Sequence, residues 1–390
     1  MLPMPRAIPD LPSAPGFATL DRMNASPSQR QLLRRQCTLT LPGFRSLTPV
    51  EEFEALARWC AQRGGAEADV YGEGGLAVEF EQRIATLLGK PAAVFMPSGV
   101  MAQLIALRLH AEQARLDRFG MSPNAHLALH EREAPQALFG LHGVPVGSRL
   151  QPLRAEDLAA VKEPLAALVV ELPMREAGGL LPEWDELQAL QARAAEMRLP
   201  LHLDGARLWQ CRAFYGGRSF AEIAAGFESV YVSVYKDIGG MSGALLAGSE
   251  DFIAHARIWL RRMGGNLYQQ TATVASAMMR FDERLAMMDA CHRRAVQVAD
   301  VLAALPGVRV NPRRPQANMF HLHIDAPAEA LNAARDAIAE EERAWLFGAA
   351  RPMEVQGFSV IELSVGDNLL ALDDATVARL FGRLLARART

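Results

Sequence analysis

Short apolar segments alternate with amphipathic segments along most of the chain, and this alternation constrains the fold more than any other feature. The apolar segments cover residues 92–96, 126–130, 166–173, 201–205 and 229–236, and we interpret each as a strand. Helical segments such as WDELQALQARAAEMR, with apolar residues three and four positions apart, lie between several of them. Continuously apolar strands are typical of a parallel sheet covered by helices on both faces. The sequence therefore predicts an α/β fold with a mostly parallel sheet.

The rest of the pattern indicates how the chain divides. Residues 243–249 follow the last apolar segment after a very short connection, so we expect them to pair antiparallel. A long helix is expected from about residue 267 to 305, followed by strands and helices typical of a small α+β domain. We therefore predict a proline-rich N-terminal arm (1–32), a large α/β domain (33–275), and a linking helix with a small C-terminal domain (276–390).

Composition and charge argue against several classes of protein. The formal net charge is −3 and the charged residues are dispersed, which does not suggest a nucleic-acid or membrane-surface protein. No apolar run approaches the roughly 20 residues that span a bilayer, and the N-terminus does not resemble a signal peptide. The four cysteines form no CxxC pair, so we expect neither a zinc site nor disulfides, and a cytoplasmic location. His321 and His323 alternate on one strand without an apparent third ligand, so no metal site is expected.

Residues suited to chemistry stand where predicted strands end. Ser98 and Gly99 lie where a strand turns into a helix, and a helix N-terminus offers free N–H groups and a positive dipole end to a phosphate. For these two residues alone, an ordinary helix cap is the commoner explanation. Asp204 and Arg207 follow another strand, where a surface ion pair would also explain them.

Lys236 ends a further strand and enters a glycine-rich turn, although a solvated lysine is the commoner case, and Arg175 lies just beyond the strand ELP. Together, these features match what pyridoxal phosphate requires. A lysine amine forms the Schiff base, a carboxylate such as Asp204 holds the pyridine nitrogen protonated, and a helix N-terminus binds the phosphate.

With these residues in order, the sequence resembles the fold-type I pyridoxal-phosphate enzymes, and more narrowly the threonine aldolase and β-eliminating lyase family. The resemblance covers most of the chain from about residue 33 onward. The motifs that carry it are DVYGEGGLAVEFEQRIATLLGK, PSGVMAQLIALRLH, ELPMREAGG, LHLDGARL, SVYVSVYKDIGG, LRRMGGNLYQ and QANMFHLHI. It implies the aspartate aminotransferase-like fold, with a sheet of the seven-stranded type in the large domain.

The resemblance also implies roles for individual residues. Lys236 would bind the cofactor covalently, Asp204 would bond the pyridine nitrogen, and Arg207 would approach the ring hydroxyl or the substrate carboxylate. The residues expected at the phosphate are Ser98, Gly99 and Val100. Such enzymes are usually homodimers or homotetramers with shared active sites, and the residues expected near the shared site are Tyr71, Gly72 and Arg261.

The chain departs from the family at several positions that bear on the reaction. Glu133 or Ala134 stands where a histidine usually stacks on the ring, with His130 a few residues away. Met174 occupies the place of a histidine thought to handle the substrate hydroxyl, and Val100 replaces a threonine of the phosphate motif.

The residues that would grip the substrate carboxylate also differ. Gln36 replaces a serine near the N-terminus, and SVIELSVGD lacks the family's arginine. Arg175, Arg351 or Arg34 could substitute, and we rank Arg175 first because it lies in a matched motif.

We therefore expect a pyridoxal-phosphate lyase that cleaves a β-hydroxy-α-amino acid by a retro-aldol step into glycine and an aldehyde. The base stays open between a bound water, Glu133, His130 and the phosphate. The alternatives are β- or γ-elimination or dehydration of a related amino acid, an aminotransferase, and a non-catalytic cofactor-binding protein, since fold does not fix function.

Overall fold

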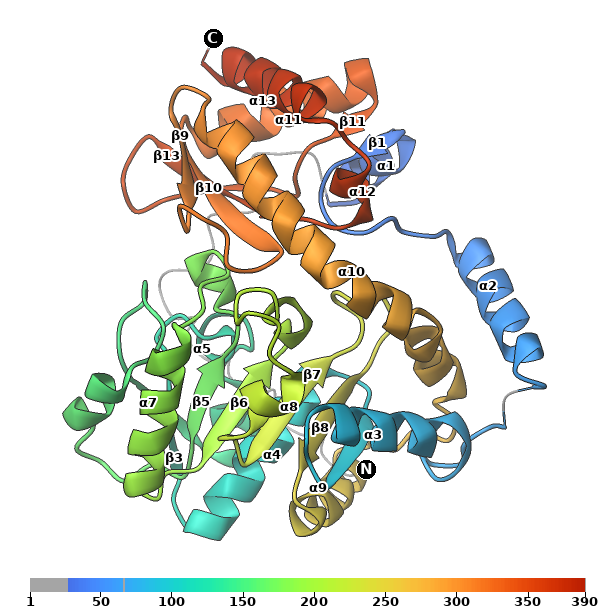
Figure 1. Cartoon of the computed structure of the whole chain (residues 1–390), viewed down its shortest axis with the longest axis vertical. Coiled ribbons are helices and arrows are strands. Elements are labelled where there is room, and N and C mark those ends of the chain that lie inside the picture. The colour runs from blue at the N-terminus through green and yellow to red at the C-terminus, as the bar shows by residue number, and fades with distance from the viewer. Residues whose placement is uncertain (1–26, 66, 390) are drawn as a thin grey trace, which may run out of the picture.

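The computed structural model describes residues 27–65 and 67–389, and a seven-stranded sheet forms the centre of its large domain (Figure 1). In spatial order the strands are β2 (Ala92–Met96), β8 (Ala244–Gly248), β7 (Ser229–Ser233), β6 (Leu201–Gly205), β5 (Leu168–Glu171), β3 (Arg118–Met121) and β4 (His142–Pro145). All neighbouring strands are parallel except β8, which is antiparallel to both β2 and β7. The predicted mostly parallel sheet is confirmed, and so is the predicted antiparallel pairing of residues 243–249 with their neighbours.

Helices cover both faces of this sheet. One face packs against α3 (Gly75–Leu87), α7 (Trp184–Glu196), α8 (Phe220–Ala224) and the first half of α10 (Thr271–Ala303). The other face packs against α4 (Gly99–Ala114), α6 (Ala134–Phe139) and α9 (Glu250–Arg262). On β6, Leu201 and Leu203 enter the first of these cores, so His202 and Asp204 face the α4 side. This alternation positions much of the site described below.

The prediction of a strand at 126–130 is wrong. These residues form the single helical turn α5 (His126–Leu129), and the sheet edge is built instead from β3 and β4. A run of three apolar residues between two histidines fits one helical turn as well as a strand, so periodicity could not distinguish them. The backbone N–H of His126 donates to the side chain of Glu171, which fixes the turn at the end of β5.

The long helix α10 carries the chain from the large domain to the small one. The small domain is an antiparallel sheet in the order β12 (Ala350–Pro352), β13 (Phe358–Ser364), β10 (Met319–Asp325) and β9 (Val308–Asn311). The helices α11 (Ala328–Glu342), α12 (Asp367–Leu370) and α13 (Asp374–Ala388) pack with it around a separate apolar core. The predicted small α+β domain is present.

The start of the described chain packs with the small domain. Helix α1 (Pro27–Gln36) packs beside α11, and β1 (Leu39–Thr40) pairs in parallel with β11 (Ala344–Trp345). Leu41 is fully buried in the small-domain core. The predicted arm otherwise falls mostly on residues 1–26, which lie outside the described residues.

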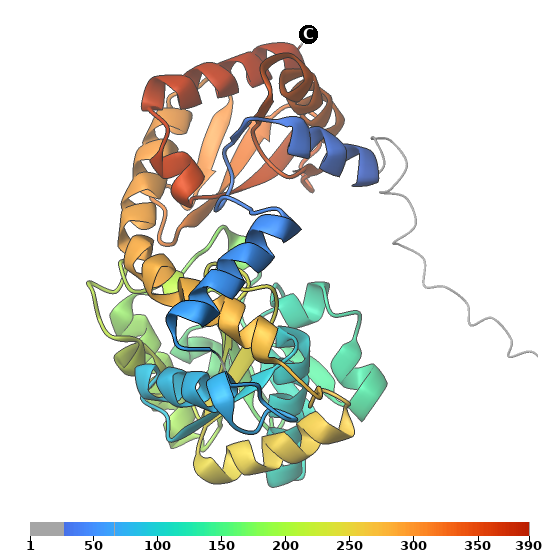
Figure 2. The ribbon, with the colours of Figure 1, turned by 90° about the vertical axis from the view of Figure 1, so that its right-hand side faces the viewer.

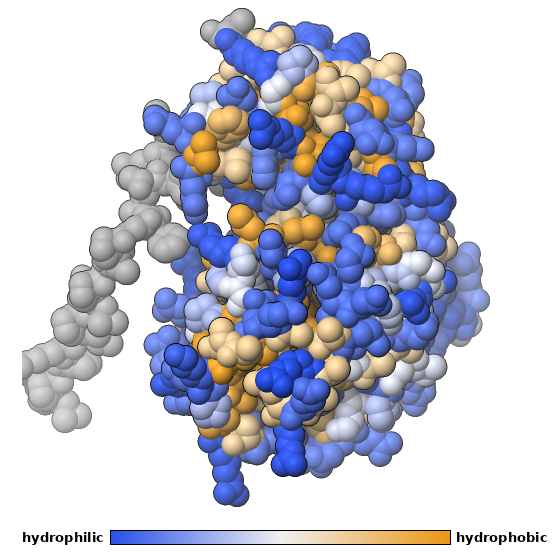
Figure 3. Space-filling view, turned by 60° about the vertical axis from the view of Figure 1, so that its left-hand side comes forward, coloured by the Kyte–Doolittle hydropathy of each residue, from blue (hydrophilic) through white to orange (hydrophobic). Residues whose placement is uncertain are grey.

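Helix α2 (Pro49–Gln62) then crosses to the large domain and lies beside α10 (Figures 1 and 2). It begins with a capping box, because Thr48 and Glu51 each accept a backbone hydrogen bond from the other. Hydrophilic side chains cover much of the face seen in Figure 3, interspersed with apolar ones. Within 27–65 and 67–389, no helix is long and apolar enough to cross a bilayer.

Candidate active site

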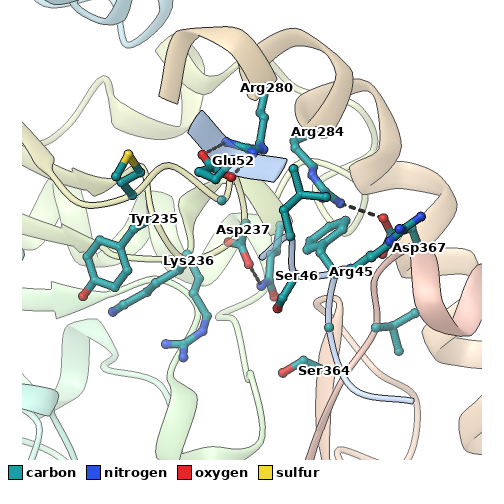
Figure 4. A pocket seen from close by; sticks show the side chains of 18 of the residues that line it. Arg45, Ser46, Glu52, Tyr235, Lys236, Asp237, Arg280, Arg284, Ser364 and Asp367 are labelled. Carbon is teal, nitrogen blue, oxygen red and sulfur yellow. Dashed lines mark hydrogen bonds and ion pairs between the residues drawn. The ribbon is translucent and has the colours of Figure 1, made fainter. Parts of the chain in front are cut away.

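A cleft of about 890 Å³ lies where the two domains meet (Figure 4). Its walls come from the segment that leads into α2, from the loops after β6 and β7, and from α10 and the small domain. Lys236 and Asp237 enter it from the loop after β7, and Arg207 enters it from the loop after β6, just before the short helix η3 (Leu208–Gln210). The predicted Lys236 and Arg207 therefore meet in one cavity.

Lys236 is suited to act as a nucleophile. It makes no ion pair with any described residue, and its Nζ lies 5.8 Å from the centroid of the Tyr235 ring. Burial lowers the pKa of Lys236, and the positive charge of Arg207 lowers it further, while nearby acids act in the opposite sense. A lowered pKa increases the fraction of neutral amine, which is the form that attacks a carbonyl group.

Asp204 is almost completely buried and is held by neutral donors. Gln103 Nε2 donates to Asp204 Oδ2 at 2.6 Å, and the backbone N–H of Ala206 donates to Oδ1 at 3.1 Å. No Lys, Arg or His side chain of the described chain lies within ion-pair distance of it. A buried carboxylate without a protein cation can pair with a cationic ligand, such as a protonated pyridine ring.

Glu171 lies directly opposite Asp204 in the β5–β6 register, and nothing in the sequence pattern singled it out. Its carboxylate accepts the backbone N–H groups of Arg175 and His126. Enclosure of the carboxyl group raises the pKa of Glu171 to about 7, and the negative charge of Asp204 contributes to the increase. The residue as a whole is half-buried, but its carboxyl group is enclosed. Protonation of Glu171 is therefore coupled to the charge of Asp204.

The predicted phosphate site is the N-terminus of α4. The Ser98 hydroxyl caps this helix by accepting the N–H of Met101, and the Ser98 carbonyl accepts that of Ala102. The preceding N–H groups of Gly99 and Val100 have no partner in the first turn and are available to an anion. Gly99 is required here by packing, since a Cβ at this position would overlap the hydroxyl group and ring of Tyr231.

Replacing Gly99 by alanine should destabilise the protein and distort the helix N-terminus. Overpacking of this kind costs about 1–3 kcal/mol, and the cofactor should bind more weakly because the free N–H groups shift. Gly382, inside α13 with nothing within 4 Å of a built Cβ, provides a matched control. Gly382→Ala should leave cofactor binding unchanged and stabilise slightly. Chemical denaturation and cofactor titration of both variants test this, and equal behaviour would contradict it.

Arg175, ranked first for the substrate carboxylate, is already paired on two sides. Its Nη1 lies 3.1 Å from Glu176 Oε1, and its Nε lies 2.8 Å from Glu362 Oε2. Glu176 also contacts Arg351 at 3.3 Å and His130 at 2.9 Å. By contrast, Arg207 makes no ion pair with any residue of 27–65 or 67–389.

Three further predicted residues, Glu133, Arg261 and Tyr71, lie on the surface. Glu133 begins α6 with an exposed side chain, and Arg261 is exposed on α9. Tyr71, beside Gly72, is 54% exposed and stacks edge-on against Tyr268 at 5.5 Å between ring centroids. None of the three lines the cleft that contains Lys236.

Comparison with known proteins identifies the family. Residues 54–325 match the β-eliminating lyase family. The crystal structure of a Listeria monocytogenes protein assigned as an L-allo-threonine aldolase is 35% identical to this chain and has a TM-score of 0.85, covering 92% of this chain and 98% of that one. The chain belongs to the β-eliminating lyase family. The low specificity L-threonine aldolase of Escherichia coli K12 is 28% identical over 240 residues, or 60% of this chain and 71% of that protein.

Pyridoxal phosphate is the cofactor of this family member, and the residues present fit it. The unpaired Lys236 amine, the Asp204 carboxylate without a protein cation, and the free N–H groups at the start of α4 would meet its three requirements. In the described part of the chain, no group of three His, Cys, Asp or Glu side chains is arranged to hold a metal ion. The protein is therefore a pyridoxal-phosphate-dependent lyase.

Proposed function

We propose that the protein cleaves a β-hydroxy-α-amino acid between Cα and Cβ, releasing glycine and an aldehyde. The observation that carries this proposal is the placement of Lys236 and Arg207 in one cleft, with the buried Asp204 at the end of β6 just before Arg207, in a chain 35% identical to a structure assigned as an L-allo-threonine aldolase. When bound, pyridoxal phosphate supplies a ring that accepts electrons from the substrate Cα.

The chain's own residues orient the substrate. Arg207 is the best candidate for the substrate carboxylate, because it enters the cleft beside Lys236 and has no ion-pair partner among the described residues. Arg175 would first have to leave Glu176 and Glu362. Gripping the carboxylate fixes which bond of Cα stands perpendicular to the ring, and so selects between cleavage of Cα–Cβ and loss of the Cα proton.

Asp237 is the best candidate for the base that removes the proton of the substrate hydroxyl. It lines the cleft directly after Lys236 (Figure 4). Its Oδ1 accepts a hydrogen bond from Gln210 Nε2 at 2.6 Å, whereas its buried Oδ2 has no partner within the described residues. Of the candidates that the sequence left open, His130 and Glu133 are less suitable, since His130 is bound to Glu176 and Glu133 is exposed.

Replacing Asp237 by asparagine should lower kcat by about 10²–10⁴-fold, the usual contribution of a positioned base, with a smaller change in KM. Burial raises the pKa of Asp237 above its ordinary value, so wild-type activity should fall as the pH drops through that raised pKa. The variant should lack this acidic decline. Asp300→Asn, an exposed change on α10, is the control. An unchanged pH profile of kcat in Asp237→Asn would assign the base elsewhere.

Product analysis tests the proposed function itself. The pyridoxal-phosphate-loaded protein is incubated with L-threonine and with L-allo-threonine, and we expect glycine and acetaldehyde. Formation of 2-oxobutyrate and ammonia would instead favour the elimination alternative, which Met174 in place of a histidine leaves open. A normal cofactor spectrum without any turnover would favour a non-catalytic protein.

We also propose that the protein forms a homodimer or homotetramer in the cytoplasm. Four apolar side chains, Val70, Tyr71, Leu267 and Tyr268, are each about half exposed, and Tyr71 and Tyr268 are in contact. Such a patch is typical of a surface that packs on a partner. Sedimentation velocity tests the assembly, and a monomer at micromolar concentration would contradict it. The four free cysteines are compatible with a reducing compartment.

A further inference from the structure

Four polar residues form a continuous buried row behind Asp204. Gln103 and His110 lie seven residues apart on the face of α4 that packs against the sheet, and His202 and Ser229 lie opposite each other on β6 and β7. All four are at most 2% exposed. Burying a polar side chain in an apolar helix–sheet interface costs free energy unless it forms hydrogen bonds. Each of the four is therefore expected to have a hydrogen-bond partner.

The row is connected by short hydrogen bonds. Gln103 contacts Asp204 Oδ2 at 2.6 Å through Nε2 and His202 Nε2 at 2.6 Å through Oε1. Ser229 Oγ lies 2.7 Å from His202 Nδ1 and 2.7 Å from His110 Nε2. The chain of contacts therefore runs from the proposed ring-binding carboxylate into the interior, and ends at His110.

The charge of Asp204 fixes the direction of every donor in this row. An ionised carboxylate can only accept, so the Gln103 amide must donate to it, and Gln103 Oε1 must accept from His202 Nε2–H. Neutral His202 then accepts at Nδ1 from the Ser229 hydroxyl. The Ser229 oxygen in turn accepts from His110 Nε2–H. Burial lowers the pKa of His202 to about 3 and that of His110 to about 4, so both rings are neutral at physiological pH.

His110, at the interior end of the row, favours the same direction of donors. His110 Nδ1 is buried and has no hydrogen-bond partner among the described residues. In the direction given above it is a bare acceptor. In the opposite direction, which a protonated Asp204 would permit, it would carry a buried N–H without a partner, and unpaired buried donors are rarer than unpaired acceptors.

We propose that Gln103, His202, Ser229 and His110 are positioning residues, forming a hydrogen-bond chain of fixed direction that keeps Asp204 an acceptor for the cofactor's ring N–H. Asp204 needs such support because Glu171 stands directly opposite it, and two neighbouring carboxyl groups compete for one proton. In the direction that the bare His110 Nδ1 favours, the row places a donor on Asp204, which stabilises its ionised form and leaves the shared proton to Glu171. This inference rests on pyridoxal phosphate as the cofactor and does not depend on the substrate.

Long-range ¹H–¹⁵N correlation spectra of the ¹⁵N-histidine-labelled holoenzyme test the direction without any reaction. His110 and His202, assigned from the signals lost in His110→Gln and His202→Gln, should both carry their proton on Nε2 with a bare Nδ1. A proton on Nδ1 of His202, or a doubly protonated ring at neutral pH, would overturn the proposal.

Variants of Gln103 test whether this hydrogen-bond chain supports cofactor binding by Asp204. Gln103→Leu should weaken cofactor binding about 10- to 100-fold, as expected for a lost hydrogen bond to a buried charge, and should shift the pH at which the bound cofactor's absorbance changes. Gln103→Glu should bind poorly at alkaline pH and recover on acidification, since a protonated glutamic acid can again donate to Asp204. Gln188→Leu on the surface of α7 is the matched control. Wild-type affinity and absorbance in Gln103→Leu across pH 6–9 would overturn the proposal.

Discussion

Replacing Lys236 by alanine should lower kcat at least about 10³-fold, because no other amine can take its place in the cleft. Lysine occurs at three positions of the sequence, 90, 162 and 236, and the other two are accounted for. Lys90 donates to the carbonyl oxygens of Ala224 and Phe227, and Lys162 is exposed. The variant should also lose the visible absorbance of the covalently bound cofactor.

With three lysines in the sequence, the site of covalent attachment can be identified directly. Borohydride reduction of the loaded wild-type protein should fix the cofactor to the peptide that contains Lys236, which mass spectrometry identifies. Lys162→Ala is the matched control and should keep both absorbance and activity. Cofactor fixed to Lys90 or Lys162, or a coloured and active Lys236→Ala protein, would contradict the assignment of the site.

The sequence predicted the sheet and the strand-end residues for the same physical reason. Buried parallel strands are largely apolar, so the charged residues at or just beyond their ends, Asp204, Arg207 and Lys236, stand out. Strand β3 lacks this signal, because its four residues, RFGM, begin with an arginine and include a glycine, and it lies near the sheet edge. The strand predicted at 126–130 took its place because the local pattern fits both structures.

Residues that support the site were missed because their roles depend on partners distant in sequence. Glu171 becomes important through the β5–β6 register that places it opposite Asp204. Gln103 matters because α4 packs over β6, and its partner Asp204 lies 101 residues further along the chain. A weak signal was present in the sequence. Gln103 and His110 are polar residues spaced by two turns on the buried side of a helix whose neighbours there are apolar.

Replacing Asp204 by asparagine should lower kcat by about 10²–10³-fold, a loss comparable to removing one preorganised electrostatic partner of a transition state. The amide is nearly the same size as the carboxylate, but it cannot hold a positive charge on the ring nitrogen. The ring then accepts electrons less well while the cofactor remains bound through Lys236 and the N-terminus of α4. The absorbance of the bound cofactor should therefore persist with an altered dependence on pH.

The same variant should also disturb the row of residues behind it. If the introduced asparagine keeps its oxygen toward the N–H of Ala206, its amide nitrogen faces Gln103, whose side chain must turn over. His202 would then have to carry its proton on Nδ1, and the histidine spectra would report the change directly. Asp117→Asn, an exposed change before β3, should alter neither kcat nor the spectra. Full activity of Asp204→Asn would mean that the ring nitrogen needs no anionic partner, whereas lost activity with unchanged histidine tautomers would separate the role of Asp204 from that of the chain.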